Sequence, residues 1–162
     1  MSRNESVRVL LVCLGNICRS PTAHGVLEHR LQAAGLHWVT VDSAGTAAYH
    51  QGKGPDARAT AAAARRGVAL AHLRARQVVA ADFNTFDLIL AMDAQNLADL
   101  REMAPLDARA SVRLFLDFAQ DLAVDEVPDP YYGGAYGFEQ VLDLVEAAAD
   151  GLVERLRSGD WR

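Results

Sequence analysis

The run VRVLLVC (Val7–Cys13) constrains the fold of this chain more than any other stretch. Apolar side chains fill nearly every position, which is typical of a strand covered on both faces. Further strand patterns occur at 37–43, 86–92 and 111–118, and helical patterns separate them. Strands that alternate with helices predict parallel β-α-β units, so we expect an α/β fold with an open sheet and helices on both faces.

Local signals predict where the helices begin. Ser20 is suited to cap a first helix, and Asp56 and Asp93 each stand directly before a helical pattern. The two prolines and three glycines of 124–137 predict a long loop, and a last amphipathic helix is expected from Phe138 to Leu156.

The bulk composition narrows the class of protein. A length of 162 residues suits one core, so we expect a single domain over 1–162. A net charge of -5 without a basic stripe argues against a nucleic-acid partner. No apolar run approaches the roughly 20 residues of a membrane helix. The start of the chain is interpreted as a strand rather than a signal peptide, and two cysteines five positions apart favour a reducing cytoplasm.

The loop from Cys13 to Arg19 joins the first strand to the first helix, at the sheet edge where α/β folds bind ligands. Unpaired N–H groups at a helix N-terminus attract phosphate or sulfate. Gly15 permits a tight turn that lets successive N–H groups converge on an anion. The planar fork of Arg19 can bind two oxygens at once. The loop is therefore predicted to bind phosphate or another oxyanion.

The same field favours the thiolate form of Cys13, which would be ready to attack phosphorus in line. Ser20 could hydrogen-bond the sulfur and ease its departure from a phosphocysteine. Taken singly, a cysteine at a strand end is usually packing and an arginine after a strand is usually surface. Cys-x5-Arg-Ser between a buried strand and a helix is much more restrictive. A Walker loop is excluded because GNICRSPT lacks its second glycine and its lysine.

A general acid is also needed, because phosphate transfer to sulfur leaves an oxyanion that takes a proton. Asp129 in VPDPYYGG is the candidate, since prolines flank it and two tyrosines could line a pocket mouth. By itself, Asp-Pro is also an ordinary turn signal.

Together these stretches resemble the low-molecular-weight protein tyrosine phosphatase family. VCLGNICRSP matches the catalytic loop of that family almost letter for letter, and DPYYG matches its general-acid loop. VDSAGT, GVALAHLRARQV, DFNTFDLILAMD and NLADL also resemble family segments, in the family's order. The resemblance extends from about Val7 to Leu156.

The resemblance implies a three-layer sandwich whose four-stranded parallel sheet has strand order 2-1-3-4. It implies hydrolysis of phosphotyrosine in proteins, with Cys13 as nucleophile, Arg19 as phosphate binder and Asp129 as acid and then base. No metal or organic cofactor is implied. Supporting roles are implied for Ser43 and His72, which would hydrogen-bond Asn16, and for Asp56, Arg58 and Asp93. The expected substrate-binding residues are Leu14, Gly15, Asn16, Ile17, Cys18, Ser20, Tyr49, Tyr131 and Tyr132.

Other positions carry weaker expectations. Cys18 would trap oxidised Cys13 as a disulfide, which makes the enzyme redox-sensitive. At least one of Tyr49 and His50 is expected to contact substrate. His24 departs from the glutamate common in the family, and we expect it to be exposed and inert. The protein is expected to be a monomer or a weak dimer.

Three alternative functions stay open. A related class dephosphorylates arginine, and by resemblance it carries threonine where this chain has Ile17. Arsenate reduction on the same fold needs further cysteines to relay a disulfide, and this chain has two. A silent phosphate-binding partner would not need Cys13, Arg19 and Asp129 together.

Overall fold

The computed structural model describes residues 6–120, 122–131 and 135–162, and for 135 and 136 the backbone alone. Tyr132, expected at the substrate site, lies outside these residues. The described chain forms a parallel sheet with the order β2-β1-β3-β4, which confirms the expected topology. Its strands are β1 (Val7–Cys13), β2 (Val39–Gly45), β3 (Leu88–Ala91) and β4 (Ser111–Leu114).

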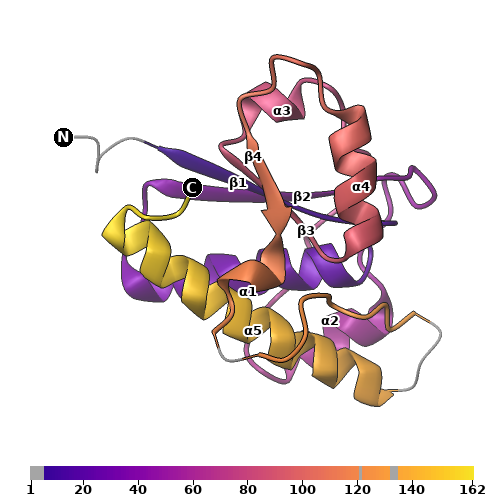
Figure 1. The fold of residues 1–162 in the computed structure, drawn as a ribbon. Helices are drawn as coiled ribbons and strands as arrows, with labels where there is room; N and C mark the ends of the chain where they lie inside the picture. The colour runs from indigo at the N-terminus through magenta and orange to yellow at the C-terminus, as the bar shows by residue number, and fades with distance from the viewer. Residues whose placement is uncertain (1–5, 121, 132–134) are drawn as a thin grey trace.

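Helices cover both faces of this sheet (Figure 1). One face carries α1 (Arg19–Ala34), α2 (Ala57–Ala64) and α5 (Ala135–Ser158), and the other carries α3 (Asp82–Thr85) and α4 (Ala94–Met103). Successive residues of β1 belong to different apolar clusters, since Leu11 packs on the α1 and α5 side and Leu10 on the α4 side. This alternation explains why nearly every position of the strand is apolar.

The helix starts follow local chemistry in two cases out of three. Asp56 and Asp93 cap α2 and α4 as predicted, with side chains that accept backbone N–H groups. Ser20 is not a cap, because α1 begins at Arg19 and Cys18 occupies the cap position without a side-chain hydrogen bond. The hydroxyl of Ser20 instead turns toward Cys13.

The predicted strand at 111–118 is half wrong. β4 ends at Leu114, and a short 3₁₀ helix, η2 (Phe115–Phe118), follows it. The α5 helix packs so closely over η2 that a Cβ on Gly151 would collide with the carbonyl of Phe118. Helix α5 also begins at Ala135, inside the predicted 124–137 loop.

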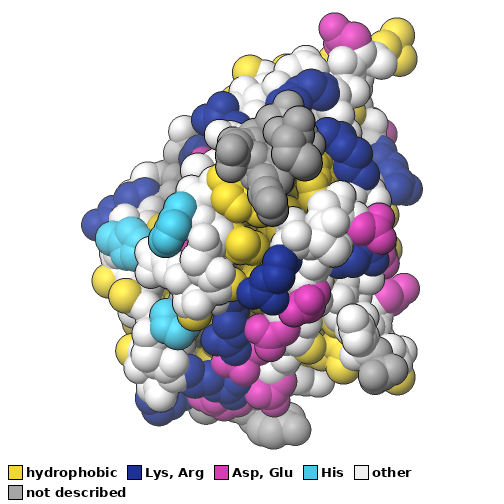
Figure 2. Space-filling view, turned by 90° about the vertical axis from the view of Figure 1, so that its left-hand side faces the viewer, with side chains coloured by type: hydrophobic (Ala, Val, Ile, Leu, Met, Phe, Trp, Pro, Cys, Tyr) yellow, Lys and Arg dark blue, Asp and Glu magenta, His cyan; other side chains and the backbone are white. Residues whose placement is uncertain are grey.

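The sheet sets the location of the site, because β1 and β2 end side by side at Cys13 and Gly45. Figure 2 shows the other side of the molecule, where β1 begins. Positive and negative side chains are interleaved on that face. Among the described helices, none is long and apolar enough to cross a membrane.

Candidate active site

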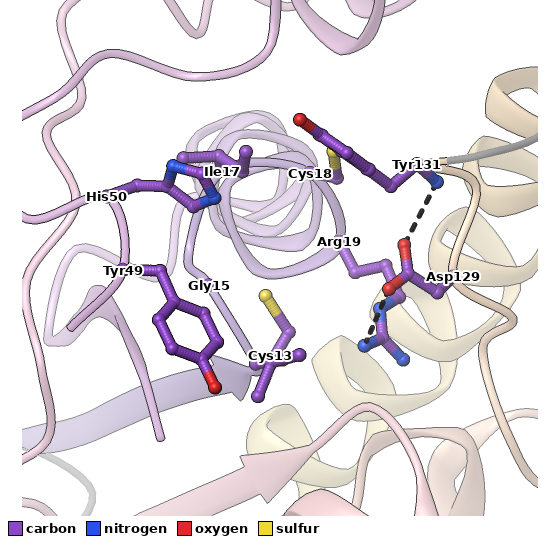
Figure 3. Close-up of a pocket in the computed structure, with 10 residues that line it drawn as sticks. Cys13, Gly15, Ile17, Cys18, Arg19, Tyr49, His50, Asp129 and Tyr131 are labelled. Carbon is purple, nitrogen blue, oxygen red and sulfur yellow. Dashed lines mark hydrogen bonds and ion pairs between the residues drawn. The ribbon is translucent and has the colours of Figure 1, made fainter. Parts of the chain in front are cut away.

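A pocket of about 310 Å³ opens at the carboxyl end of β1. The first turn of α1 and the loops after β2 and before α5 surround it (Figure 3). Most of the predicted site residues meet here. The lining residues are Cys13, Leu14, Gly15, Ile17, Cys18, Arg19, Tyr49, His50, Asp129 and Tyr131.

Cys13 lies at the base of the pocket, with its sulfur directed into it (Figure 3). Its side chain is almost fully buried. The Cys13 Sγ atom is 3.0 Å from Ser20 Oγ and accepts the backbone N–H of Ser20 at 3.4 Å. These two contacts hold the sulfur against the first turn of α1.

The loop is braced by Asn16 rather than by the flexibility of Gly15. Asn16 has a φ of 58° and is the one non-glycine residue in the left-handed region among those described. Its side chain donates to Ser20 Oγ at 2.7 Å and accepts the backbone N–H of Arg76 at 3.0 Å. These two bonds hold a backbone conformation that an L-residue otherwise disfavours.

The loop is packed tightly against the end of β2. The backbone N–H of Thr46 donates to Cys13 O at 2.9 Å, and that of Ala47 donates to Leu14 O at 3.0 Å. A Cβ on Gly45 would lie 2.6 Å from Leu14 O and 3.2 Å from Asn16 N. Gly45 therefore permits this close approach. Sequence reasoning missed its role, although the VDSAGT match contained the signal.

Arg19 is buried but held by negative groups from two other segments. Its Nη1 donates to Asp93 Oδ2 at 2.6 Å and to Val127 O at 3.0 Å, and its Nη2 is 3.8 Å from Asp129 Oδ2. Burial acts against the charge of Arg19. Cys13, the hydrogen bond to Asp93 and the charges of Asp93 and Asp129 outweigh it and raise the pKa of the guanidinium. Arg19 therefore stays a cation beside Cys13.

Asp129 lies across the pocket from Tyr49 and His50 (Figure 3). Its side chain is 46% exposed. The Oδ1 atom accepts the backbone N–H of Tyr131 at 3.0 Å, and Oδ2 faces Arg19. One carboxylate oxygen is thus directed toward the cation at the base of the pocket.

Arg58 and Asp56 tie this acid loop to the rest of the site. Arg58 Nη2 donates to Tyr131 O at 2.9 Å and to Asp56 Oδ2 at 3.0 Å. The backbone N–H of Asp56 donates to Ile17 O at 2.8 Å. The start of α2 therefore links the Cys13 loop to the segment that carries Asp129.

The rim is apolar and aromatic. Tyr49 is 72% exposed, and Leu14 and Tyr131 are also open to solvent. His50 lies over Gly15, where a Cβ would come within 3.0 Å of its Cδ2. These side chains surround a pocket mouth that suits a flat aromatic group above an anion.

Cys18 lines the same pocket, and neither it nor Cys13 forms a disulfide in this structure. Burial raises the pKa of the Cys18 thiol to about 12, and the charges of Asp56, Cys13 and Asp129 act in the same direction. Cys18 is therefore a neutral thiol at physiological pH.

The expectation that His24 is exposed is wrong. His24 is 6% exposed. Its Nδ1 lies 3.0 Å from Ser43 Oγ, and its Nε2 lies 3.3 Å from Glu28 Oε2. The hydrogen bond from His24 lowers the pKa of Glu28, against the effect of burial.

His72 is exposed and forms no hydrogen bond with any described residue. The expected bonds from Asn16 to Ser43 and His72 are replaced by bonds to Ser20 and Arg76. In the part of the chain that the structure describes, no three His, Cys, Asp or Glu side chains are grouped to hold a metal ion.

Comparison with known proteins agrees with this geometry. Residues 8–160 match the family model described as low molecular weight phosphotyrosine protein phosphatase. A low molecular weight protein-tyrosine-phosphatase of Streptomyces coelicolor is 47% identical over 154 residues, which cover 93% of each chain. The crystal structure of a protein tyrosine phosphatase from Entamoeba histolytica is 40% identical with a TM-score of 0.91, and the match covers 95% of this chain and 99% of that one. A Drosophila arginine phosphatase is 31% identical with a TM-score of 0.86, over 91% and 96% of the two chains.

Proposed function

Because this chain belongs to the low molecular weight phosphotyrosine protein phosphatase family, we propose that it hydrolyses phosphotyrosine in proteins through a phosphocysteine on Cys13. The convergence of Cys13, Arg19 and Asp129 on one pocket carries this proposal. Cys13 and Arg19 stand at the two ends of one loop and Asp129 comes from a distant one, and an acid, a cation and a nucleophile are what the reaction needs. An aromatic rim above the loop suits the long phenolic ester.

In the first step, the Cys13 thiolate attacks phosphorus in line as the bond to the phenolic oxygen breaks. Arg19 and the N–H groups of the loop bind the nonbridging oxygens, where positioned charge lowers the barrier. Protonated Asp129 donates its proton to the leaving oxygen, so tyrosine departs neutral.

In the second step, water attacks the phosphocysteine and Asp129, now a carboxylate, takes the proton of that water. The sulfur–phosphorus bond breaks, inorganic phosphate leaves and the thiolate is regenerated. Ser20, at 3.0 Å from the sulfur, stabilises the departing anion. Replacing Ser20 with alanine should therefore slow breakdown of the intermediate more than its formation.

The proposal is tested with a chromogenic aryl phosphate and with phosphotyrosine peptides. Wild type should release phosphate from both, and Cys13→Ser should release none above background. Circular dichroism and a urea unfolding curve control for folding of the variant. Phosphate release by Cys13→Ser at the wild-type rate would exclude the thiolate mechanism.

Arginine dephosphorylation is the second candidate, because a similar solved structure is named an arginine phosphatase. Ile17 lines the pocket with an apolar side chain, which favours an aromatic ester over the strongly polar phosphoguanidino group. Matched peptides with phosphotyrosine, phosphoserine or phosphoarginine separate the classes by kcat/KM. Faster turnover of the phosphoarginine peptide would reverse the assignment.

We also propose a cytoplasmic enzyme that is monomeric or weakly dimeric. Cys13 and Cys18 are free thiols that line the pocket, which suits a reducing compartment. Tyr131 is 37% exposed at the pocket mouth, where self-association would cover the site. Sedimentation velocity across protein concentrations and cell fractionation test these two points.

A further inference from the structure

His24 connects helix α1 to strand β2 of the sheet through a buried polar contact. It lies one helical turn after Ser20 on α1, and its Nδ1 is 3.0 Å from Ser43 Oγ on β2. Both side chains are almost fully buried. A buried hydroxyl or ring nitrogen left without a partner is unfavourable, so this contact favours one placement of α1 on β2.

A second contact between the same two elements lies beside the first. Ser20 Oγ is 3.4 Å from the backbone carbonyl oxygen of Ala44, which follows Ser43 on β2. Ser20 and His24 lie on one side of α1, since residues four apart are neighbours on a helix. The two contacts therefore cross the same α1–β2 boundary about one helical turn apart.

Ser20 is the residue that transmits this placement to Cys13. Its Oγ and its backbone N–H both contact the sulfur, and its Oγ also accepts from Asn16. A shift of the first turn of α1 would move both contacts to the sulfur together. Arg19 is held separately by Asp93 and Val127, so phosphate binding is less exposed to such a shift.

We propose that His24 is a positioning residue, whose hydrogen bond to Ser43 holds the first turn of α1 against β2 and thereby keeps Ser20 on the sulfur of Cys13. This inference rests on the proposed function, because Ser20 matters to the reaction only if Cys13 is the nucleophile. The role is distinct from an ion pair with Glu28, which uses the other ring nitrogen of His24.

Two substitutions of His24 distinguish the contact made by Nδ1 from the contact made by Nε2. The amide of His24→Asn lies near the position of Nδ1 and can still bond Ser43, whereas the amide of His24→Gln reaches toward Nε2 and Glu28. Glu28→Gln is the matched control, because it removes the carboxylate on Nε2 and leaves the Ser43 bond intact. All are assayed with an aryl phosphate at one fixed pH, and active protein is counted by stoichiometric alkylation of Cys13.

Loss of one buried hydrogen bond is expected to lower kcat of His24→Gln by about 3- to 10-fold, with KM within about twofold of wild type. His24→Asn should restore most of kcat, and Glu28→Gln should keep the wild-type value. In a Ser20→Ala background, His24→Gln should cause no further loss, because the two residues act in series.

A merely structural role would lower the unfolding midpoint without this pattern in kcat. The inference is overturned if His24→Gln keeps the wild-type kcat, if the asparagine and glutamine variants lose kcat equally, or if the His24 and Ser20 effects multiply. Should wild type release no phosphate, the proposed function fails on its own. In that case the rate at which iodoacetamide alkylates Cys13 tests whether His24 positions Ser20. We expect this rate to be about 3- to 10-fold lower in His24→Gln and unchanged in His24→Asn and Glu28→Gln.

Discussion

The guanidinium of Arg19 and the carboxylate of Asp93 lie 2.6 Å apart, although 74 residues separate them in the sequence. Asp93 uses its two oxygens for different tasks. Oδ1 caps α4 by accepting the N–H of Asn96 at 2.7 Å, and Oδ2 accepts from Arg19. The residue that starts one helix therefore also orients the cation at the start of another.

Replacing Asp93 with asparagine should destabilise the protein by about 2 kcal/mol, because the NH2 group of the new amide must face either the N–H of Asn96 or the guanidinium of Arg19, and both are donors. Urea unfolding measures this loss. Asp56→Asn is the control, since Asp56 also caps a helix but pairs with the exposed Arg58, and it should lose less than about 1 kcal/mol. Equal losses in the two variants would contradict a special role of the Arg19 contact.

Asp129→Asn should lower kcat/KM, which reports formation of the phosphocysteine and not its later hydrolysis, by about 10²- to 10⁴-fold on phosphotyrosine peptides, because no proton reaches the leaving oxygen. The loss should be smaller on p-nitrophenyl phosphate, whose leaving group is a stable anion. Inorganic phosphate should bind the variant as it binds wild type, since the loop and Arg19 are intact. A loss of the same size on both esters would show that Asp129 is not the acid.

Cys18 should react with alkylating agents only at strongly alkaline pH. The pKa of its thiol is raised to about 12 from an ordinary value of 9.0, and the thiolate is the reactive form. In a Cys13→Ser background, the iodoacetamide rate at Cys18 should therefore still be rising, by about tenfold per pH unit, between pH 9 and 11. In urea, where the chain is unfolded, the rate should level off just above pH 9. The same levelling of the rate in the folded protein would contradict the effect of burial on the Cys18 pKa.

The same shift makes a prediction for stability. The folded state holds the Cys18 proton up to about pH 12, whereas the unfolded chain releases it near pH 9.0. The contribution of this thiol is therefore fully present below pH 9 and is lost as the pH rises toward 12. The difference in unfolding free energy between wild type and Cys18→Ser should shrink from pH 8.5 to 10.5, and a constant difference would contradict the shift.

Gly45→Ala should distort the Cys13 loop, since its Cβ would lie 2.6 Å from a backbone carbonyl that cannot rotate away. We expect a loss of about 1–3 kcal/mol in stability together with a fall in kcat/KM. Gly54→Ala is the matched control, because its Cβ would meet only the terminal nitrogen of the Arg74 side chain, at an ordinary contact distance of 3.4 Å, and its change should be within about 0.5 kcal/mol. Wild-type kcat/KM in Gly45→Ala would show that the loop tolerates the added methyl.

Much of the candidate site could be predicted because its signals are local. Cys13 ends a strand and Arg19 begins the next helix, with one short loop between them. The surroundings of both residues therefore follow from the local sequence. The caps at Asp56 and Asp93 were predicted for the same reason. The strand order was inferred from the family resemblance, which also supported Asp129 as the acid after its flanking prolines and tyrosines had made it a candidate, since spacing alone does not bring position 129 to position 13.

By itself, the sequence determined the alternation of strands and helices and the position of Cys13 and Arg19 at the two ends of one loop, because periodicity and turn chemistry act over a few neighbouring residues. Only the tertiary structure decided that Asn16 rather than Gly15 takes the left-handed conformation, and that His24 is buried against Ser43. Both depend on partners far away in the chain. Which side of a helix is enclosed, and which hydrogen bonds can offset backbone strain, is settled only when those distant segments pack together.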